Sequence, residues 1–223
     1  MDYQFLTKTK LFQGIEEKDM ESMFACFSCK TKSYKKGDYI YHAGTKIKAL
    51  GLVLSGSVTI ENNDVWGNHS ILDCVTPGRI FAETYALCPN EILLVDIVAN
   101  EPTEILFLDT TTATTTCCNA CSCHQALIRN LLQISSRKNL NLSRHIMHTS
   151  SKTIRGRLLS YLSFQAQKQG SYEFDIPFNR QQLADYLGLD RSALSSELGK
   201  MQRDGLITFR KNHFTLSSDF DLY

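Results

Sequence analysis

Residues 178–216, with the sequence FNRQQLADYLGLDRSALSSELGKMQRDGLITFRKNHFTL, constrain the fold more strongly than any other stretch of the chain. Asn179 and Gln182 have the spacing of a capping box, which marks the start of a helix. Gly188 permits the left-handed backbone that ends a helix, and Asp190 can cap a second helix directly afterwards. The segment therefore predicts two short helices that are joined by a tight turn.

The apolar residues of these two helices are expected to face each other. Small Ala184 lets the helices cross closely, as in a helix-turn-helix whose second helix enters the major groove of DNA. After Gly205 the pattern predicts a β-hairpin with Arg210 and Lys211 near its turn, a basic wing suited to phosphates. The expected inward residues are Leu183, Ala184, Leu187, Leu194, Leu198 and Met201.

The opposite face of the second helix is expected to carry two arginines and no acid. Its residues are Arg191, Ser192, Ser195, Ser196, Gly199 and Arg203. A plain helical hairpin inside a core is the alternative, and the coincidence of caps, small residue, turn glycine and wing argues against it. The predicted contacts with double-stranded DNA are Arg180, Gln181, Arg191, Ser192, Ser195, Ser196, Arg203 and Lys211.

Charge is divided unevenly along the 223 residues. Residues 1–109 contain 10 Lys and Arg against 15 Asp and Glu, whereas residues 110–216 contain 14 against 6. This division indicates that only the C-terminal half meets a polyanion. A basic half is equally typical of a solvated helix face, so charge alone does not identify nucleic acid.

The N-terminal half has the pattern of a small β-domain. After short helical pieces, residues 27–108 alternate β-rich runs with glycine turns. The runs include a strand–turn–strand around Ser55-Gly56-Ser57 and an apolar strand over residues 91–99. Such spacing indicates a barrel or sandwich. The threonine-rich run at residues 110–116 predicts a weakly specified connector or a frayed helix.

A long helix is expected between Ser122 and about Ser151. Its apolar positions follow the four–three alternation of a coiled coil, interrupted by polar Ser135 and Asn139. Dimerisation is the favoured interpretation because the helix is long for a small domain, and packing on its own domain is the alternative. The predicted seam residues are Ile128, Leu132, Leu142 and Ile146.

The order of β-domain, long helix and winged helix-turn-helix resembles the Crp–Fnr superfamily of bacterial transcription regulators. The resemblance spans essentially the whole chain. It is strongest in FNRQQLADYLGLDRSALSSELGKMQRDGLI and clear in KKGDYIYHAG, GLVLSGSVTI and PGRIFAE. It implies an α+β fold with three parts. These are a cyclic-nucleotide-binding-like β-barrel (a double-stranded β-helix or jelly roll) with N-terminal helices at residues 1–116, a dimerisation helix at 117–150, and a winged helix-turn-helix DNA-binding domain at 151–223.

The resemblance also implies a mode of action. Members of the superfamily are homodimers that bind an inverted-repeat operator, and an effector that reaches the barrel repositions the two DNA-binding domains. Recruitment or obstruction of RNA polymerase follows. The implied partners are therefore double-stranded DNA, RNA polymerase, a second copy of the chain and an unknown small-molecule effector.

One departure from the family concerns the effector turn, which survives as Phe81-Ala82-Glu83 with alanine in place of glycine. Cyclic-nucleotide-binding members carry an arginine shortly afterwards that clamps the phosphate, but residues 86–100 contain no Arg or Lys. A buried phosphate without a cationic partner is penalised, so cyclic AMP is not the expected effector. Phe81, Ala82, Glu83 and Thr84 remain the candidate pocket. Glu83 can hold a neutral or cationic effector, although a solvent-facing carboxylate is the favoured interpretation.

The second departure lies in the recognition helix. Typical members read SRETxSR, in which the glutamate and the second arginine reach base edges. Here the matching stretch is DRSALSS, which keeps Arg191 and places serines at positions 192 and 196. Serine contacts bases with little discrimination, so the resemblance implies a different DNA half-site.

Four of the eight cysteines, Cys117, Cys118, Cys121 and Cys123, lie directly before His124. Three interpretations stay open: packing at the barrel–helix junction, a metal site that uses Cys118 and Cys121, and reversible oxidation of thiols at a helix N-terminus. In the last two cases the stretch makes the protein a metal or redox sensor that controls DNA binding. We expect no stoichiometric metal and no cofactor, because the other CxxC, Cys26 to Cys29, lies far away in the expected barrel.

Other classes of protein are not indicated. No apolar run approaches the roughly 20 residues that a membrane span needs. The N-terminal residues have no signal-peptide pattern, so a cytoplasmic protein is expected. No Ser/His/Asp constellation, HExxH motif or phosphate loop is present, so we do not expect an enzyme.

Overall fold

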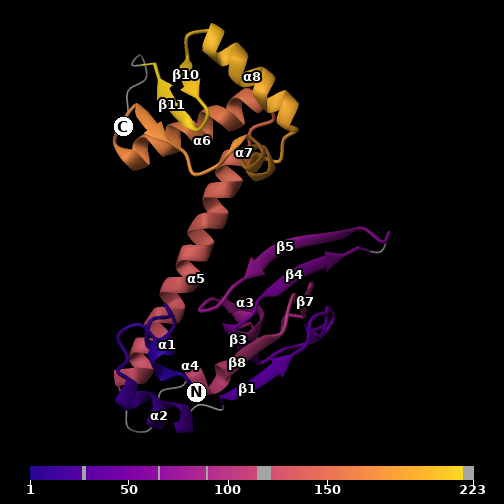
Figure 1. The fold of residues 1–223 in the computed structure, drawn as a ribbon, viewed down its shortest axis with the longest axis vertical. Coiled ribbons are helices and arrows are strands. Elements are labelled where there is room, and N and C mark those ends of the chain that lie inside the picture. The colour runs from indigo at the N-terminus through magenta and orange to yellow at the C-terminus, as the bar shows by residue number, and fades with distance from the viewer. Residues whose placement is uncertain (27–28, 65, 89, 115–121, 218–223) are drawn as a thin grey trace. The chain divides into compact units, whose positions relative to one another are not determined.

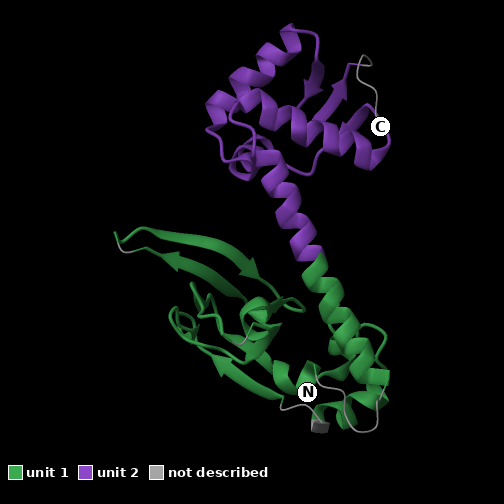
Figure 2. Ribbon diagram, turned by 180° about the vertical axis from the view of Figure 1, so that it is seen from behind, with its two compact units in different colours: residues 1–136 green, residues 137–223 purple. Residues whose placement is uncertain are grey.

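The computed structural model describes residues 1–26, 29–64, 66–88, 90–114 and 122–217 (Figure 1). The chain divides into two compact units, an N-terminal unit of residues 1–136 and a C-terminal unit of residues 137–223 (Figure 2). The long helix α5 (Ser122–Thr149) begins in the first unit and ends in the second, which confirms the expected helix in this region. Among the described residues, no helix combines the length and the apolar character that crossing a bilayer requires.

The N-terminal unit consists of two antiparallel four-stranded sheets with short helices around them. The strand orders are β1-β8-β3-β6 and β2-β7-β4-β5. Pairing among the described strands stays within each sheet, so hydrogen bonds do not close the expected barrel, while the α+β class is confirmed. The elements are α1 (Tyr3–Thr7), α2 (Glu17–Cys26), β1 (Lys30–Tyr34), β2 (Tyr39–Tyr41), β3 (Ala49–Ser55), β4 (Val58–Asn63), β5 (His69–Val75), β6 (Ile80–Phe81), α3 (Glu83–Ala86), β7 (Asp96–Ala99), β8 (Thr103–Asp109) and α4 (Thr110–Thr114).

The tight turn at Gly56 joins the two sheets. Strands β3 and β4 flank it as expected, but they do not pair with one another, because β3 pairs with β8 and β4 pairs with β7. Gly56 has φ +75°, and a Cβ atom there would lie 2.4 Å from the carbonyl oxygen of Pro102. Only glycine therefore fits where the chain crosses between the sheets.

The strand expected over residues 91–99 is shorter than the sequence indicated, since β7 covers only Asp96–Ala99. The backbone of Leu93 explains the difference. Its N–H donates to the carbonyl of Thr45 at 2.9 Å, and its carbonyl accepts from Gly44 at 2.7 Å. Both groups are thus satisfied by a distant loop rather than by a sheet ladder.

The first part of α5 belongs to the core of the N-terminal unit. Ala126, Leu127 and Leu131 are buried in it. The buried amide of Asn130 donates to the carbonyls of Leu11 and Gln13 at 2.9 and 2.8 Å. One face of the helix is therefore occupied by its own domain.

The C-terminal unit has the winged helix-turn-helix architecture that the sequence predicted. Its three-stranded sheet has the order β10-β11-β9 and packs with three helices around one apolar core. The first helix begins at the Thr153 cap and ends at Gly170, which is left-handed with φ 64°. The elements are α6 (Ile154–Gln169), β9 (Glu173–Asp175), α7 (Arg180–Leu187), α8 (Arg191–Arg203), β10 (Ile207–Arg210) and β11 (His213–Leu216).

Candidate nucleic-acid interface

Local sequence signals build the helix pair α7–α8. Asn179 and Gln182 form a complete capping box, and Gly188 ends α7 in the left-handed conformation with φ 61°. Asp190 caps α8 by accepting the backbone N–H of Ala193 at 2.8 Å. This bond and one from the Ser192 hydroxyl, the larger effect, lower the pKa of the Asp190 carboxyl, so it stays ionised where the helix dipole favours negative charge. These predicted caps are confirmed.

The apolar faces of α7 and α8 also agree with the prediction. All six expected inward residues are fully buried: Leu183, Ala184, Leu187, Leu194, Leu198 and Met201. Burial of such side chains stabilises a fold by about 1.5–3 kcal/mol each for the larger ones. The outward face of α8 is therefore oriented by the core beneath it.

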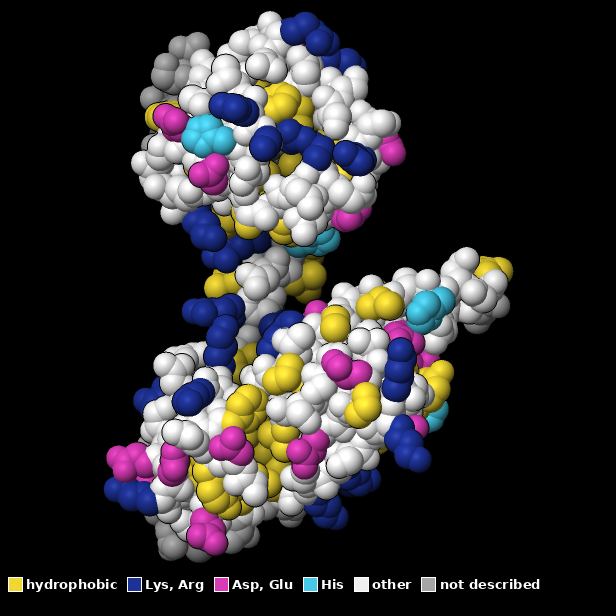
Figure 3. Space-filling view, viewed as in Figure 1, with side chains coloured by type: hydrophobic (Ala, Val, Ile, Leu, Met, Phe, Trp, Pro, Cys, Tyr) yellow, Lys and Arg dark blue, Asp and Glu magenta, His cyan; other side chains and the backbone are white. Residues whose placement is uncertain are grey.

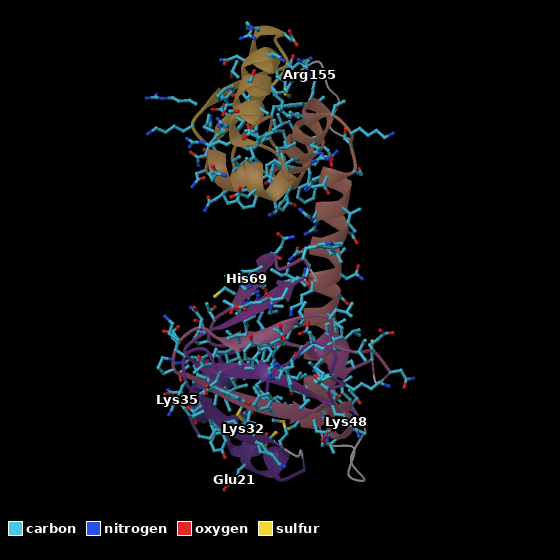
Figure 4. The ribbon with its side chains drawn as sticks, turned by 90° about the vertical axis from the view of Figure 1, so that its right-hand side faces the viewer. Glu21, Lys32, Lys35, Lys48, His69 and Arg155 are labelled. Carbon is cyan, nitrogen blue, oxygen red and sulfur yellow. The ribbon has the colours of Figure 1, made fainter. Side chains whose placement is uncertain are left out.

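Two arginines on α6 form bonds to the helix pair α7–α8 and to its turn. Arg155, labelled in Figure 4, bonds Glu197 at 2.6 Å and Asp204 at 2.7 Å, and so ties α6 to α8 and its C-cap. Arg157 donates to the carbonyls of Leu187 and Gly188 at 2.9 and 3.2 Å, which fixes the turn. Sequence reasoning missed both, because their partners lie about 30 to 50 residues away and no local pattern marks them.

The outward face of α8 is exposed and largely uncommitted. Arg191, Ser192, Ser195, Ser196 and Arg203 are all exposed. The Ser192 hydroxyl donates to Asp190, and the Ser195 hydroxyl donates to the carbonyl of Arg191 at 2.9 Å. Within the described part of the chain, no ion pair holds Arg191 or Arg203. Their guanidinium groups can therefore pair with an external anion or base.

The remaining predicted contacts surround the wing. The Gln181 amide donates to Asp185 at 2.8 Å, and Lys211 is exposed in the turn between β10 and β11. Arg180 is half-buried and donates to the Lys211 carbonyl at 3.1 Å. A cleft of about 490 Å³ separates the start of α7 from this turn. Figure 3 shows Lys and Arg side chains spread over the visible face of this unit.

The candidate effector turn in the N-terminal unit differs from expectation at one residue. Glu83 is only 3% exposed, so the favoured solvent-facing position was wrong. It begins α3 at the edge of the core, whereas Thr84 beside it is exposed. Ala82 adopts φ 61°, a left-handed conformation that costs a non-glycine residue about 1–2 kcal/mol. This explains why the family prefers glycine there.

The position of Phe81 explains why residue 51 is a glycine. Its ring is buried directly over Gly51, where a Cβ atom would lie 2.2 Å from the ring. Phe81 is therefore part of the core.

The cysteine-rich stretch at residues 117–124 is only partly described by the structure. Cys117, Cys118 and Cys121 lie outside the described residues, while Cys123 is half-buried and His124 is buried. In the other pair only the Cys29 side chain is described, and burial raises the pKa of its thiol to about 12. Burial thus favours the neutral thiol of Cys29, which is a poor nucleophile.

The predicted seam of α5 is mostly exposed. Leu132, Leu142 and Ile146 are 66%, 60% and 57% exposed, and Ile128 is half-buried. Leu140 and Met147 are also exposed, although the four–three pattern did not include them. A row of large apolar side chains in water is unfavourable by about 25 cal/mol per Å² of surface, so covering this row would be favourable.

Comparisons with known proteins agree with both units. The cyclic nucleotide-binding domain family matches residues 31–117, and the Crp-like helix-turn-helix domain family matches residues 156–218. The chain is similar to the transcriptional activator protein FnrL of Cereibacter sphaeroides, with 21% identity over 205 residues that cover 85% of this chain and 77% of FnrL. Electron transport regulator A of Shewanella oneidensis is 25% identical over 202 residues, which cover 86% of this chain and 76% of the relative.

A solved structure shows the same fold. The catabolite activator protein of Thermus thermophilus superposes with a TM-score of 0.51 at 21% identity, covering 94% of each chain. The two matched domains also follow one another in the order that the sequence motifs predicted. Together with the capped helix pair and its wing, these matches establish that the chain belongs to the Crp–Fnr superfamily and is a DNA-binding transcription regulator of the Crp–Fnr type.

Proposed function

We propose that the protein acts as a homodimer that binds an inverted repeat in double-stranded DNA. The observation that carries this proposal is the exposed apolar row on α5, formed by Leu132, Leu142 and Ile146. A second copy of the same helix is the simplest partner for it, since isologous contacts use the same surface on both subunits.

A dimer of this kind has a geometric consequence for the operator. Each copy supplies one recognition helix α8, and a two-fold axis along the paired α5 helices relates the two. The half-sites are then expected to be inverted, with centres about one helical turn, or roughly 34 Å, apart. The outward residues of α8 read the bases, and Lys211 contacts phosphate.

We further propose that the N-terminal unit receives a small-molecule effector and that the bound dimer recruits or obstructs RNA polymerase in the cytoplasm. The likeness of residues 31–117 to the cyclic nucleotide-binding domain family supports a ligand-sensing role for this unit. The turn of Phe81, Ala82, Glu83 and Thr84 is the place where we expect the effector to act.

Two measurements test the proposal. Sedimentation should show a dimer at micromolar concentration, and genome-wide mapping of bound DNA should recover fragments that share an inverted repeat. A matched strain that produces Arg191→Ala controls for non-specific recovery, because this variant keeps the dimer helix and loses a recognition contact. A monomer by sedimentation, or bound fragments that share only a single half-site, would contradict the proposal.

A further inference from the structure

Arg180 is the first residue of α7, yet its side chain is turned onto the wing. Its guanidinium carbon lies 5.0 Å from the ring centre of Phe209 and 5.7 Å from that of Phe214. Burial lowers the pKa of this guanidinium, although the group stays protonated. A cation over two ring faces in a partly desolvated place is a substantial attraction, so the side chain has a defined position.

The two rings lie near the turn of the wing hairpin, one residue pair away from the pair that closes it. Phe209 and Phe214 are cross-strand partners of β10 and β11, and their rings stack at 5.7 Å. Phe214 is fully buried and stacks in turn on Phe174 of β9 at 6.4 Å. Arg180 is therefore connected through these rings to all three strands of the sheet.

The same guanidinium also holds the wing turn, residues 210–213. Its Nη2 donates to the carbonyl of Lys211, whose φ of 57° is a left-handed conformation that side-chain-bearing residues rarely adopt. The next residue, Asn212, exchanges hydrogen bonds with Ile176 at 2.9 and 3.2 Å. The turn is thus held by α7 on one side and by the end of the β9 segment on the other.

We infer that Arg180 is a positioning residue for the wing, and that it acts on DNA through Lys211 rather than by a contact of its own. In this position the guanidinium is half-buried over both rings, and one of its nitrogens already donates to the strained turn. While it stays, the exposed ammonium of Lys211 is presented at the end of an ordered hairpin. The Arg180→Lys variant keeps the positive charge. It loses the planar guanidinium, which can stack on a ring and donate a hydrogen bond at the same time.

This inference rests on the DNA-binding function, and salt titrations test it with a charge-preserving variant. Affinity for a mixed-sequence duplex of roughly 30 base pairs, about three helical turns, is measured by anisotropy as salt is varied. A plot of log affinity against log salt has a negative slope. We expect Arg180→Lys and Lys211→Gln each to make this slope shallower by about 0.9, which corresponds to the loss of one phosphate contact. The double variant should lose no more than Lys211→Gln alone. Arg137→Lys, a charge-preserving change on α5, is the control and should keep the wild-type slope.

A second measurement does not depend on DNA. Hydrogen exchange of the amides in residues 210–213 should become about tenfold faster in Arg180→Lys and stay unchanged in Arg137→Lys. Unchanged exchange at the wing, a wild-type salt slope in Arg180→Lys, or additive losses in the double variant would each overturn the inference. If the wild-type protein binds no duplex, the DNA-binding function fails, and the exchange measurement alone then decides the role of Arg180.

Discussion

Arg191 is the predicted base or phosphate contact with the clearest geometry. It stands in the first turn of α8, directly after the Asp190 cap, and its side chain is exposed. Because a good bidentate base contact discriminates by about 1–3 kcal/mol, we expect Arg191→Ala to weaken operator binding by that amount. Ser196→Ala, a change on the same face, should cost less than about 0.5 kcal/mol. Anisotropy titrations with a recovered genomic fragment compare the two, and equal losses would contradict the assignment.

His148 near the end of α5 gives a prediction about pH. The ring is only 1% exposed, with Nδ1 2.9 Å from the Tyr186 hydroxyl. Its Nε2 is buried and has no hydrogen-bond partner among the described residues. Burial, followed by the charges of His145 and Arg144, lowers the pKa of His148 from 6.5. The rings of Tyr161 and Phe164 complete its surroundings.

The sign of the pH effect follows from this lowered pKa. The unfolded state binds a proton more readily than the folded one, so the stability from a neutral His148 is present above pH 6.5 and is lost as the pH falls through the lowered value. We expect the melting temperature of the wild-type C-terminal unit to fall between about pH 7 and pH 5. His148→Phe should fall less, and an equal decline in both proteins would show that His148 is not the responsible group.

Some residue roles could be predicted from the sequence and others could not. The caps of Asn179 and Asp190 bond groups three residues away, so a short pattern contains the whole interaction. Arg180 and Phe209 are about 30 residues apart, and the burial of Glu83 depends on the packing of an entire domain. No local pattern carries either fact, which is why the contact of Arg180 with the wing rings was not predicted and Glu83 was expected to face solvent.

At the level of elements, α5 has two different environments. Leu127 and Leu131 are buried in the N-terminal core, whereas Leu142 and Ile146 farther along are exposed. Leu142→Glu should therefore leave the melting of either unit within about 0.5 kcal/mol, because no described core loses a side chain. It should convert the proposed dimer to a monomer, since a charge in an apolar seam is strongly penalised.

Sedimentation together with operator binding measures this effect. Asn141→Glu adds the same charge at the neighbouring exposed position and serves as the matched control. We expect the control to remain a dimer with wild-type affinity. A Leu142→Glu protein that stays dimeric would place the seam elsewhere on the molecule.

The elements themselves were predictable to unequal degrees. Helices α7 and α8 follow from period and caps within one short stretch of sequence. Strands are defined by distant partners, as when Lys30 pairs with Phe107 across the chain. The apolar run at residues 91–95 looked like a strand, yet its backbone bonds a loop at residues 44 and 45. Only Leu93 of this run is fully buried, while Ile92 and Leu94 are exposed, so hydropathy shows neither which of these residues enter the core nor which groups their backbone bonds.

At the scale of the whole molecule, the uneven distribution of charge and the two family matches both divide the chain into two different halves. The basic half contains the winged helix-turn-helix, and the acidic half contains the sheet-rich unit. Between Lys48 and Arg129 the chain has a single Lys or Arg, which is Arg79. This segment, which contains the Phe81–Thr84 turn, is poorly suited to bind an anionic ligand, even though the matched family is the cyclic nucleotide-binding domain.

The side chain of Arg79 is already bonded to residues of β5. Its guanidinium lies 3.3 Å from Asp73 and donates to the Cys74 carbonyl at 3.1 Å, so it is held against β5. A cyclic phosphate then meets the buried Glu83 turn without a cationic partner. We expect calorimetry to show no saturable cyclic AMP binding at millimolar ligand, and operator affinity to stay the same with and without it. Adenosine, which lacks the phosphate, is the matched ligand control. Saturable cyclic AMP binding that adenosine does not reproduce, and that Glu83→Gln removes, would show that this turn clamps a phosphate by groups other than arginine.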